Sequence, residues 1–196
     1  MMFIIGLTGS IGMGKSSTAE VFRQLGCAVW DADAAVRRLY SKEGQAVAPM
    51  REDFPDAITN DTVDREKLKR IIADDQAALG KIESIVHPLV ASDRANFLSN
   101  HQGEIVVLDI PLLFETGSAD HMDAVVVVST DAETQRQRVL DRGTMTEAQF
   151  KRILAKQLPD SEKRAKADFV VITDTPENAE RQVQLILEKI RSTMDA

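Results

Sequence analysis

The chain has 196 residues and a mass of 21.6 kDa, above the commonest single-domain size of roughly 100–150 residues. One compact core with an insertion is the organisation we expect. With 43% hydrophobic and 28% charged residues, the composition excludes a disordered, collagen-like or disulfide-stapled chain. No apolar run approaches the roughly 18 residues that cross a bilayer, so we expect no membrane partner.

Signals of location and reactivity are sparse. The first apolar stretch has no basic segment before it, which argues against a secretory signal. Cys27 is the single cysteine and cannot form an internal disulfide, as is usual in a reducing compartment. We therefore predict a cytoplasmic protein in which Cys27 is a buried apolar residue and not a nucleophile.

The charge is unevenly distributed. A net charge of -7 disfavours a general nucleic-acid binder, because affinity for the phosphate backbone comes from clustered positive charge. Residues 136–166 nevertheless hold nine Lys or Arg against four acids, a net +5, while the remainder of the chain carries -12. This basic segment is a candidate phosphate contact, although a solvated helix face explains most of its charges equally well.

Five short runs have the near-continuous hydrophobicity of strands buried on both faces. They are residues 3–7, 28–30, 105–110, 124–128 and 169–172. Helical spacing between the runs indicates an α/β fold with a parallel sheet. Residues 40–103 have helical spacing and no good strand, so we predict an all-helical insertion between the second and third strands.

Two further helical regions follow the fourth strand. Residues 136–140 and 144–158 have the spacing of two helices joined by a turn at 141–143. The last helix is predicted to begin at Thr175 and Pro176, a capping residue followed by proline at the first helical position.

The segment from Gly9 to Ser16 satisfies the pattern G-x-x-x-x-G-K-[ST], with a strand before it and helical spacing after it. Its glycines let backbone N–H groups wrap phosphate oxygens at a helix N-terminus. Lys15 would bridge the terminal phosphates and Ser16 would bind Mg²⁺. A chance glycine-rich turn is the alternative, and the context on both sides disfavours it. The predicted ATP-binding residues are Ser10, Ile11, Gly12, Met13, Gly14, Lys15, Ser16 and Ser17.

Acidic residues follow two of the predicted strands. No D-x-x-G or N/T-K-x-D motif of a signalling GTPase occurs. Asp31 and Asp33 follow the second strand, at the end where doubly wound sheets bind ligands. A carboxylate there can accept the proton of a substrate hydroxyl or orient Mg²⁺, and the alternative is a helix N-cap. One acid can cap while the other acts in catalysis. Asp109, after the third strand, is a candidate Mg²⁺ ligand of the Walker B type.

The apolar loop after Asp109 includes Leu112, Leu113 and Phe114. Core packing is the ordinary role of such residues, and an apolar platform for a substrate is the alternative.

These blocks together resemble the dephospho-coenzyme A kinase family. The resemblance rests on residues 7–16, on Asp31-Ala32-Asp33, on His87-Pro88, on Asp109 with Pro111-Leu112-Leu113-Phe114-Glu115, and on Gln157 followed by residues 167–170. The blocks occur in the family's order and cover nearly the whole chain. The P-loop alone is common to many small-molecule kinases, whereas the other blocks are specific.

The resemblance implies ATP-dependent phosphorylation of the ribose 3′-hydroxyl of dephospho-CoA, the last step of coenzyme A synthesis. It implies a P-loop kinase fold with a five-stranded parallel sheet, a helical CoA-binding insertion and a mobile helical lid. We assign residues 1–40, 102–135 and 167–196 to the core, 41–101 to the insertion and 136–166 to the lid.

The resemblance also implies residue roles. Asp33 would be the base, with Lys15 and Arg142 as the other catalytic residues, and Arg142 would reach the phosphates from the lid. The substrate-binding residues would be Asp33, His87, Leu112, Leu113 and Phe114. For His87 the alternative is a helix-end histidine before Pro88.

The sequence departs from the family's pattern at two places. Ser10 and Met13 stand where the family has glycine and a small residue, and a positive φ at either would be strained. Ile172-Thr173-Asp174 replaces a usual Asn and Gly, which affects expected contacts near the adenine of ATP. Two other readings remain open: a kinase for a nucleoside monophosphate or shikimate-like acid, and a nucleotide-binding regulator without transferase activity. The sequence does not determine the oligomeric state.

Overall fold

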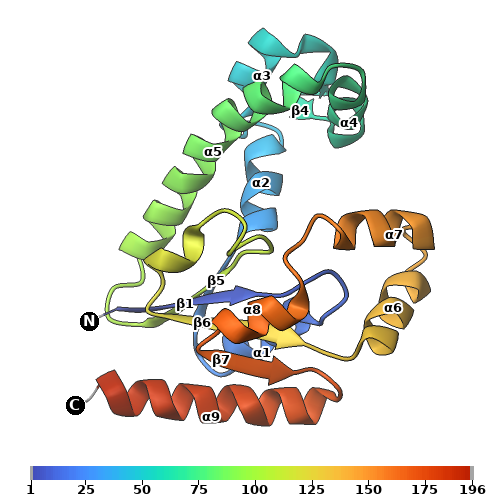
Figure 1. Ribbon diagram of the computed structural model, residues 1–196. Helices are drawn as coiled ribbons and strands as arrows, with labels where there is room; N and C mark the ends of the chain where they lie inside the picture. The colour runs from blue at the N-terminus through green and yellow to red at the C-terminus, as the bar shows by residue number, and fades with distance from the viewer. Residues whose placement is uncertain (1, 195–196) are drawn as a thin grey trace. The chain divides into compact units, whose positions relative to one another are not determined.

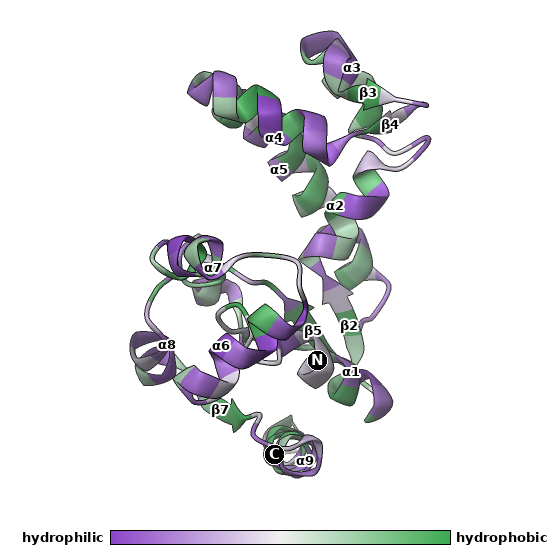
Figure 2. Cartoon of the chain, turned by 90° about the vertical axis from the view of Figure 1, so that its right-hand side faces the viewer, coloured by the Kyte–Doolittle hydropathy of each residue, from purple (hydrophilic) through white to green (hydrophobic). Residues whose placement is uncertain are grey.

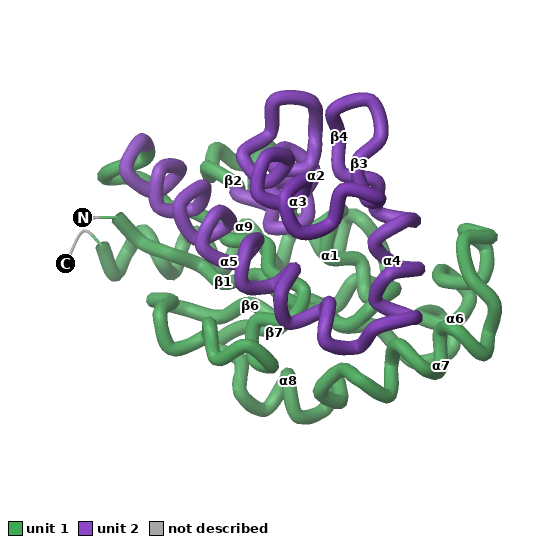
Figure 3. Tube along the Cα trace, turned by 90° about the horizontal axis from the view of Figure 1, so that it is seen from above, with its two compact units in different colours: residues 1–29, 101–196 green, residues 30–100 purple. Residues whose placement is uncertain are grey.

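The computed structural model describes residues 2–194 and divides into two compact units (Figure 3). The first unit comprises the described residues up to Val29 and from His101 onward, and the second is Trp30–Asn100. None of the helices within 2–194 is long and apolar enough to cross a membrane.

A five-stranded sheet has the order β2-β5-β1-β6-β7 (Figure 1). The strands are β1 (Phe3–Thr8), β2 (Ala28–Asp31), β5 (Ile105–Asp109), β6 (Ala124–Ser129) and β7 (Phe169–Ile172). β1 pairs in parallel with β5 and β6, and β6 pairs in parallel with β7. All five predicted strands are therefore confirmed, each to within one residue of its predicted ends.

The sheet of the first unit is buried on both faces. On one face, Val126 and Val128 of β6 join a cluster with Phe22 of α1 and Val183 of α9. On the other face, the alternate residues of β6 pack against the loop that follows β5. This explains the continuous hydrophobicity of the strands. The helices of this unit are α1 (Lys15–Gln24), α6 (Ala132–Asp141), α7 (Glu147–Leu154), α8 (Asp160–Lys166), α9 (Pro176–Met194) and the short 3₁₀ helix η2 (Ser118–His121).

The second unit is mainly helical. Its helices are α2 (Ala32–Tyr40), α3 (Val47–Asp53), the 3₁₀ helix η1 (Pro55–Ala57), α4 (Arg65–Asp74) and α5 (Gln76–Ser99). The prediction of an all-helical insertion is wrong in one place, because β3 (Ile58–Thr59) and β4 (Thr62–Val63) form a small antiparallel hairpin. Asn60 and Asp61 make its turn with φ values of 50° and 59°, a conformation that Asn and Asp tolerate well.

Two helices differ from their predicted form. α5 continues through Pro88, so the reading of His87 as a helix-end residue is wrong. α8 was not predicted, because its sequence has no apolar stripe and the residue that it buries is Lys163. In Figure 2, α8 is mostly hydrophilic in colour, in contrast to the neighbouring strand β7. The capping residue Thr146 begins α7, and its side chain forms a capping box with Gln149.

Candidate active site

The predicted phosphate-binding loop lies between the carboxyl end of β1 and the first residue of α1. Its left-handed residues are Gly12 and Gly14, with φ values of 81° and 91°, so Ser10 and Met13 cause no strain. Gly9 is required for a different reason, since a Cβ there would lie 2.3 Å from Cγ2 of Val128 on β6. The departures from the family's glycine pattern therefore leave the loop conformation intact.

Lys15 and Asp109 are brought together at the carboxyl edge of the sheet. The Nζ of Lys15 donates to Oδ1 of Asp109, and the two side chains are 16% and 3% exposed. Asp109 ends β5 while Lys15 begins α1, so the register of β5 beside β1 creates this pair. A cation and a carboxylate at the mouth of a P-loop are the groups that phosphates and Mg²⁺ require.

The groups around the loop fit a magnesium ion that arrives with a nucleotide. Mg²⁺ favours oxygen ligands and is usually held by one or two carboxylates together with water and phosphate. Ser16 supplies a hydroxyl next to Lys15, and Asp109 supplies the carboxylate. Within residues 2–194 there is no cluster of three or more His, Cys, Asp or Glu that could hold a metal by itself, so phosphate oxygens would complete the coordination.

Two glutamines hold the backbone of one P-loop residue. Gln135 of α6 donates from Nε2 to the carbonyl of Ile11 over 2.7 Å, and Oε1 of Gln157, after α7, accepts from the Ile11 N–H over 3.1 Å. The P-loop is thus attached to the chain just before the predicted lid segment, at Gln135, and within that segment, at Gln157. Gln135 was missed by the sequence analysis, because a contact across 124 residues leaves no local pattern.

Three basic residues of segment 136–166 already have polar partners close to this segment. Arg136 pairs with Glu147 at 3.1 Å, Lys151 pairs with the same carboxylate at 3.3 Å, and Arg138 hydrogen-bonds Thr173. Arg142 is the C-cap of α6, is exposed, and makes no ion pair with the described residues. Arg142 is therefore available to a phosphate, as the sequence analysis expects, and its contact with one stays a prediction.

The loop after β5 separates into exposed and buried positions. Leu112 is 41% exposed and Phe114 is half-buried. Leu113 is fully buried beside Val125 and Val127, which leaves it no surface for a substrate in this conformation. The packing alternative therefore describes Leu113, while substrate contact stays a prediction for the other two residues.

Glu115 links this loop to α8. Its side chain is 19% exposed, and Oε1 accepts from the Leu158 N–H at 2.9 Å and lies 3.0 Å from Nζ of the fully buried Lys163. Burial by itself raises the pKa of Glu115, but the hydrogen bond from the Leu158 N–H and the ammonium of Lys163 outweigh it and hold the pKa below its ordinary value. Sequence reasoning missed Lys163, since a buried lysine in a charged helix resembles a surface residue.

We expect Glu115→Gln to lower the free energy of unfolding at pH 7 by about 3–5 kcal/mol, because it leaves a buried ammonium without its counter-charge. The folded pKa is depressed, so this stabilisation is complete above the ordinary value of 4.5 and is lost as the pH falls through the folded pKa. Urea unfolding of wild type and variant at pH 7 and at a series of lower pH values measures the effect, and the difference in unfolding free energy should shrink on acidification. Glu162→Gln, at an exposed position of α8, is the control, and a difference that stays constant as the pH is lowered would contradict the assignment.

The second unit holds Asp31, Asp33 and His87. Asp31 is the N-cap of α2 and accepts from the Ala34 N–H at 2.8 Å, which confirms the capping prediction for one of the two acids. Asp33 lies exposed in the first turn of α2, with its carboxylate free of the capping role. His87 lies exposed in the middle of α5. The catalytic role of Asp33 and the substrate contact of His87 stay predictions.

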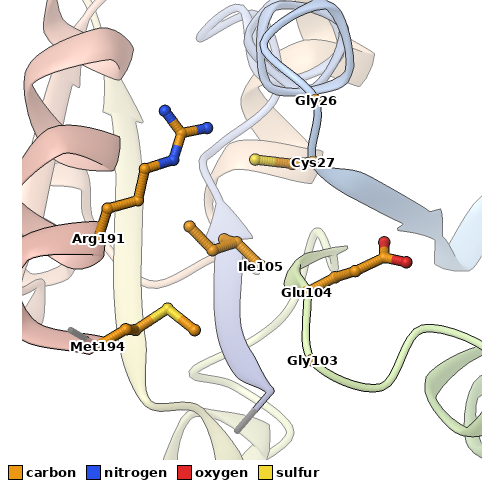
Figure 4. Close-up of a pocket in the computed structure, with 7 residues that line it drawn as sticks. All are labelled: Gly26, Cys27, Gly103, Glu104, Ile105, Arg191 and Met194. Atoms are coloured by element: carbon orange, nitrogen blue, oxygen red, sulfur yellow. The ribbon is translucent and has the colours of Figure 1, made fainter.

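A separate cavity of about 370 Å³ lies in the first unit at the amino end of β5, away from the P-loop end of the sheet. Figure 4 shows Cys27 and the Arg191 side chain of α9 on either side of it. Cys27 is 5% exposed, as predicted, and burial raises the pKa of its thiol to about 11, with partial opposition from Arg191.

We expect Cys27 to react with iodoacetamide at pH 8 at least about 50-fold more slowly in the native protein than in urea, because only the thiolate is nucleophilic. The chain has one cysteine, so the mass gained by the protein reports this site alone. Equal rates in the two states would show that the thiol is accessible and ionised.

A glycine-rich loop between β1 and α1, a lysine at its end and a facing carboxylate on a parallel sheet define a P-loop nucleotide-binding protein. The dephospho-CoA kinase family model matches residues 3–178. The dephospho-CoA kinase of Ruegeria pomeroyi is 60% identical over 192 residues, covering 98% of each chain. The chain therefore belongs to the dephospho-CoA kinase family and is an enzyme, as the resemblance implies.

Solved structures agree with this fold. The Thermus thermophilus protein TT1252 superposes with a TM-score of 0.83 at 30% identity, over 95% of this chain and 97% of that one. Dephospho-CoA kinase from Campylobacter jejuni gives a TM-score of 0.73 at 22% identity, over 98% of this chain and 100% of that one. The predicted α/β fold with a five-stranded parallel sheet is confirmed.

Proposed function

We propose that the protein transfers the γ-phosphate of ATP to the ribose 3′-hydroxyl of dephospho-CoA, giving coenzyme A and ADP in the last step of coenzyme A synthesis. The observation that carries the proposal is the Lys15–Asp109 pair beside the P-loop in a chain of this family. The loop's N–H groups and the N-terminus of α1 would hold the phosphates of ATP. Lys15 would neutralise charge as it builds up on the transferred group.

Asp33 is the proposed base. Its carboxylate would accept the proton of the 3′-hydroxyl as the hydroxyl oxygen bonds to the γ-phosphorus and the bond from that phosphorus to the ADP oxygen breaks. Asp31 is occupied as the N-cap of α2, whereas Asp33 is exposed. Mg²⁺, bound by Ser16 with Asp109 as the proposed carboxylate, would neutralise the phosphate oxygens.

Two further roles, binding of dephospho-CoA and closure over the phosphates, are assigned to separate segments of the chain. Residues 41–101, which include His87, would bind dephospho-CoA together with the exposed Leu112 and the half-buried Phe114. Residues 136–166 would act as the lid that carries Arg142 to the phosphates and excludes water, since ATP would otherwise be hydrolysed. We also propose that the enzyme is cytoplasmic, because a single, buried and unpaired cysteine is usual in a reducing compartment.

The test measures ADP release with ATP and Mg²⁺ in the presence of dephospho-CoA, AMP, CMP, shikimate or no acceptor. We expect release with dephospho-CoA and a background rate in the other reactions. Release with a different acceptor would keep the kinase class and overturn the substrate. ATP binding without stimulation by any acceptor would instead favour a nucleotide-binding regulator.

A further inference from the structure

The Thr173 side chain, which follows β7, contacts the middle of the P-loop. Its Oγ1 donates to the carbonyl of Met13 over 2.7 Å, and the Ser129 carbonyl at the end of β6 is a longer contact at 3.4 Å. Thr173 is 7% exposed, so water competes little for these bonds. The contact joins residues 160 positions apart, so no local pattern in the sequence indicates it.

This hydrogen bond fixes the direction of one peptide group. In a trans peptide the C=O and the following N–H point in opposite directions. Because the Met13 carbonyl points at Thr173, the Gly14 N–H points away from Thr173. Gly14 also packs against Thr173, since a Cβ on Gly14 would lie 3.0–3.2 Å from three Thr173 side-chain atoms. Loop residues whose N–H groups turn the same way form the anion-binding concavity of a P-loop.

Arg138 of α6 holds Thr173 from its other side. Its Nη1 donates to Thr173 Oγ1 over 3.0 Å, and its Nη2 donates to the Thr173 carbonyl. A hydroxyl has one proton to donate and lone pairs to accept, so the donation to Met13 and the acceptance from Arg138 are compatible. Donation from a guanidinium strengthens such a bond. Arg138 is half-buried and lies one helical turn before Arg142.

We propose that Thr173 and Arg138 are positioning residues that hold the Met13–Gly14 peptide with the Gly14 N–H directed at the phosphates of ATP. The inference rests on the proposed function for its nucleotide. Thr173 belongs to the segment Ile172-Thr173-Asp174, which replaces the family's usual Asn and Gly near the adenine. In this proposal its hydroxyl positions the phosphate-binding loop and does not contact the base. Phosphate affinity should therefore depend on Thr173 whether or not a base is attached to the phosphates.

The test compares ATP with inorganic tripolyphosphate, which has no base, by titration calorimetry in the presence of Mg²⁺. Thr173→Val keeps the shape of the side chain and removes its hydroxyl, and Thr173→Ser keeps the hydroxyl. We expect Thr173→Val to weaken both ligands by about 5–30-fold, the usual range for one hydrogen bond of this kind. Thr173→Ser should stay within about twofold of wild type, as should the control Thr193→Val at an exposed position of α9.

A double-mutant cycle that combines Thr173→Val with Arg138→Met tests whether Arg138 acts through Thr173. If Arg138 acts through Thr173, the two losses in tripolyphosphate affinity combine to less than their product. In steady-state assays, Thr173→Val should change the KM for ATP and kcat while the KM for dephospho-CoA stays within about twofold. Thermal unfolding of each variant separates loss of the fold from loss of positioning.

Each contrary result overturns a stated part of the inference. Loss of ATP affinity with unchanged tripolyphosphate affinity would assign Thr173 to the base, and equal losses in the valine and serine variants would assign its effect to packing. Tripolyphosphate binding no tighter in wild type than in Lys15→Ala would also contradict it. These titrations need no acceptor, so they stand even if wild type fails to phosphorylate dephospho-CoA, a result that would overturn the proposed function alone.

Discussion

An Asp33→Asn enzyme is expected to bind ATP within a few-fold of the wild-type affinity and to turn over about 10²–10⁴-fold more slowly, the usual effect of removing a general base. The amide keeps the size of the carboxylate but cannot accept the proton of the substrate hydroxyl at neutral pH. Asp33 is exposed in the first turn of α2 and does not cap it, so its replacement should leave the fold intact. Calorimetry for ATP and a coupled assay for ADP measure the two quantities.

Asp31→Asn is the matched control, two residues away. Asn is as good an N-cap as Asp, so the hydrogen bond to the Ala34 N–H should survive and turnover should stay within about threefold. Wild-type turnover in Asp33→Asn would remove Asp33 from the mechanism. An equal loss in both variants would mean that the negative charge of this turn matters, and not a base at one position.

The second large effect is expected at Lys15. Lys15→Ala should weaken ATP binding by at least about tenfold and lower turnover by about 10²–10³-fold, because it removes the fixed cation that we propose interacts with the transferred phosphate. It should also lower the melting temperature, since the buried carboxylate of Asp109 loses the cation beside it. Calorimetry, the ADP assay and thermal unfolding give the three values.

The double variant Lys15→Ala with Asp109→Asn distinguishes the two effects. It removes the buried charge as well, so it should recover stability without recovering turnover. Lys69→Ala controls for the loss of a lysine, because Lys69 lies on the surface in a pair with Glu66. Normal ATP affinity in Lys15→Ala would count against the role of this loop as the nucleotide site.

What the sequence predicted depends on how local each signal is. The strands, the P-loop and an N-cap supplied by one of the two acids after the second strand come from patterns within a few residues, and the structure confirms them and assigns the cap to Asp31. The β3–β4 hairpin was missed because each strand has two residues, too few for an alternating pattern. The contacts of Gln135 and Thr173 with the P-loop join distant residues. Only the folded chain brings such residues together, so no spacing in the sequence indicates them.

The attachment of both Gln135 and Gln157 to Ile11 has a mechanical consequence. The carbonyl and the N–H of one residue hold the two ends of a stretch of chain that includes most of α6 and all of α7. Because both ends of this stretch are hydrogen-bonded to the same residue, a small displacement of Ile11 would move α6 and α7 together as one body. A change in the length of the turn between α6 and α7 would leave both hydrogen bonds in place.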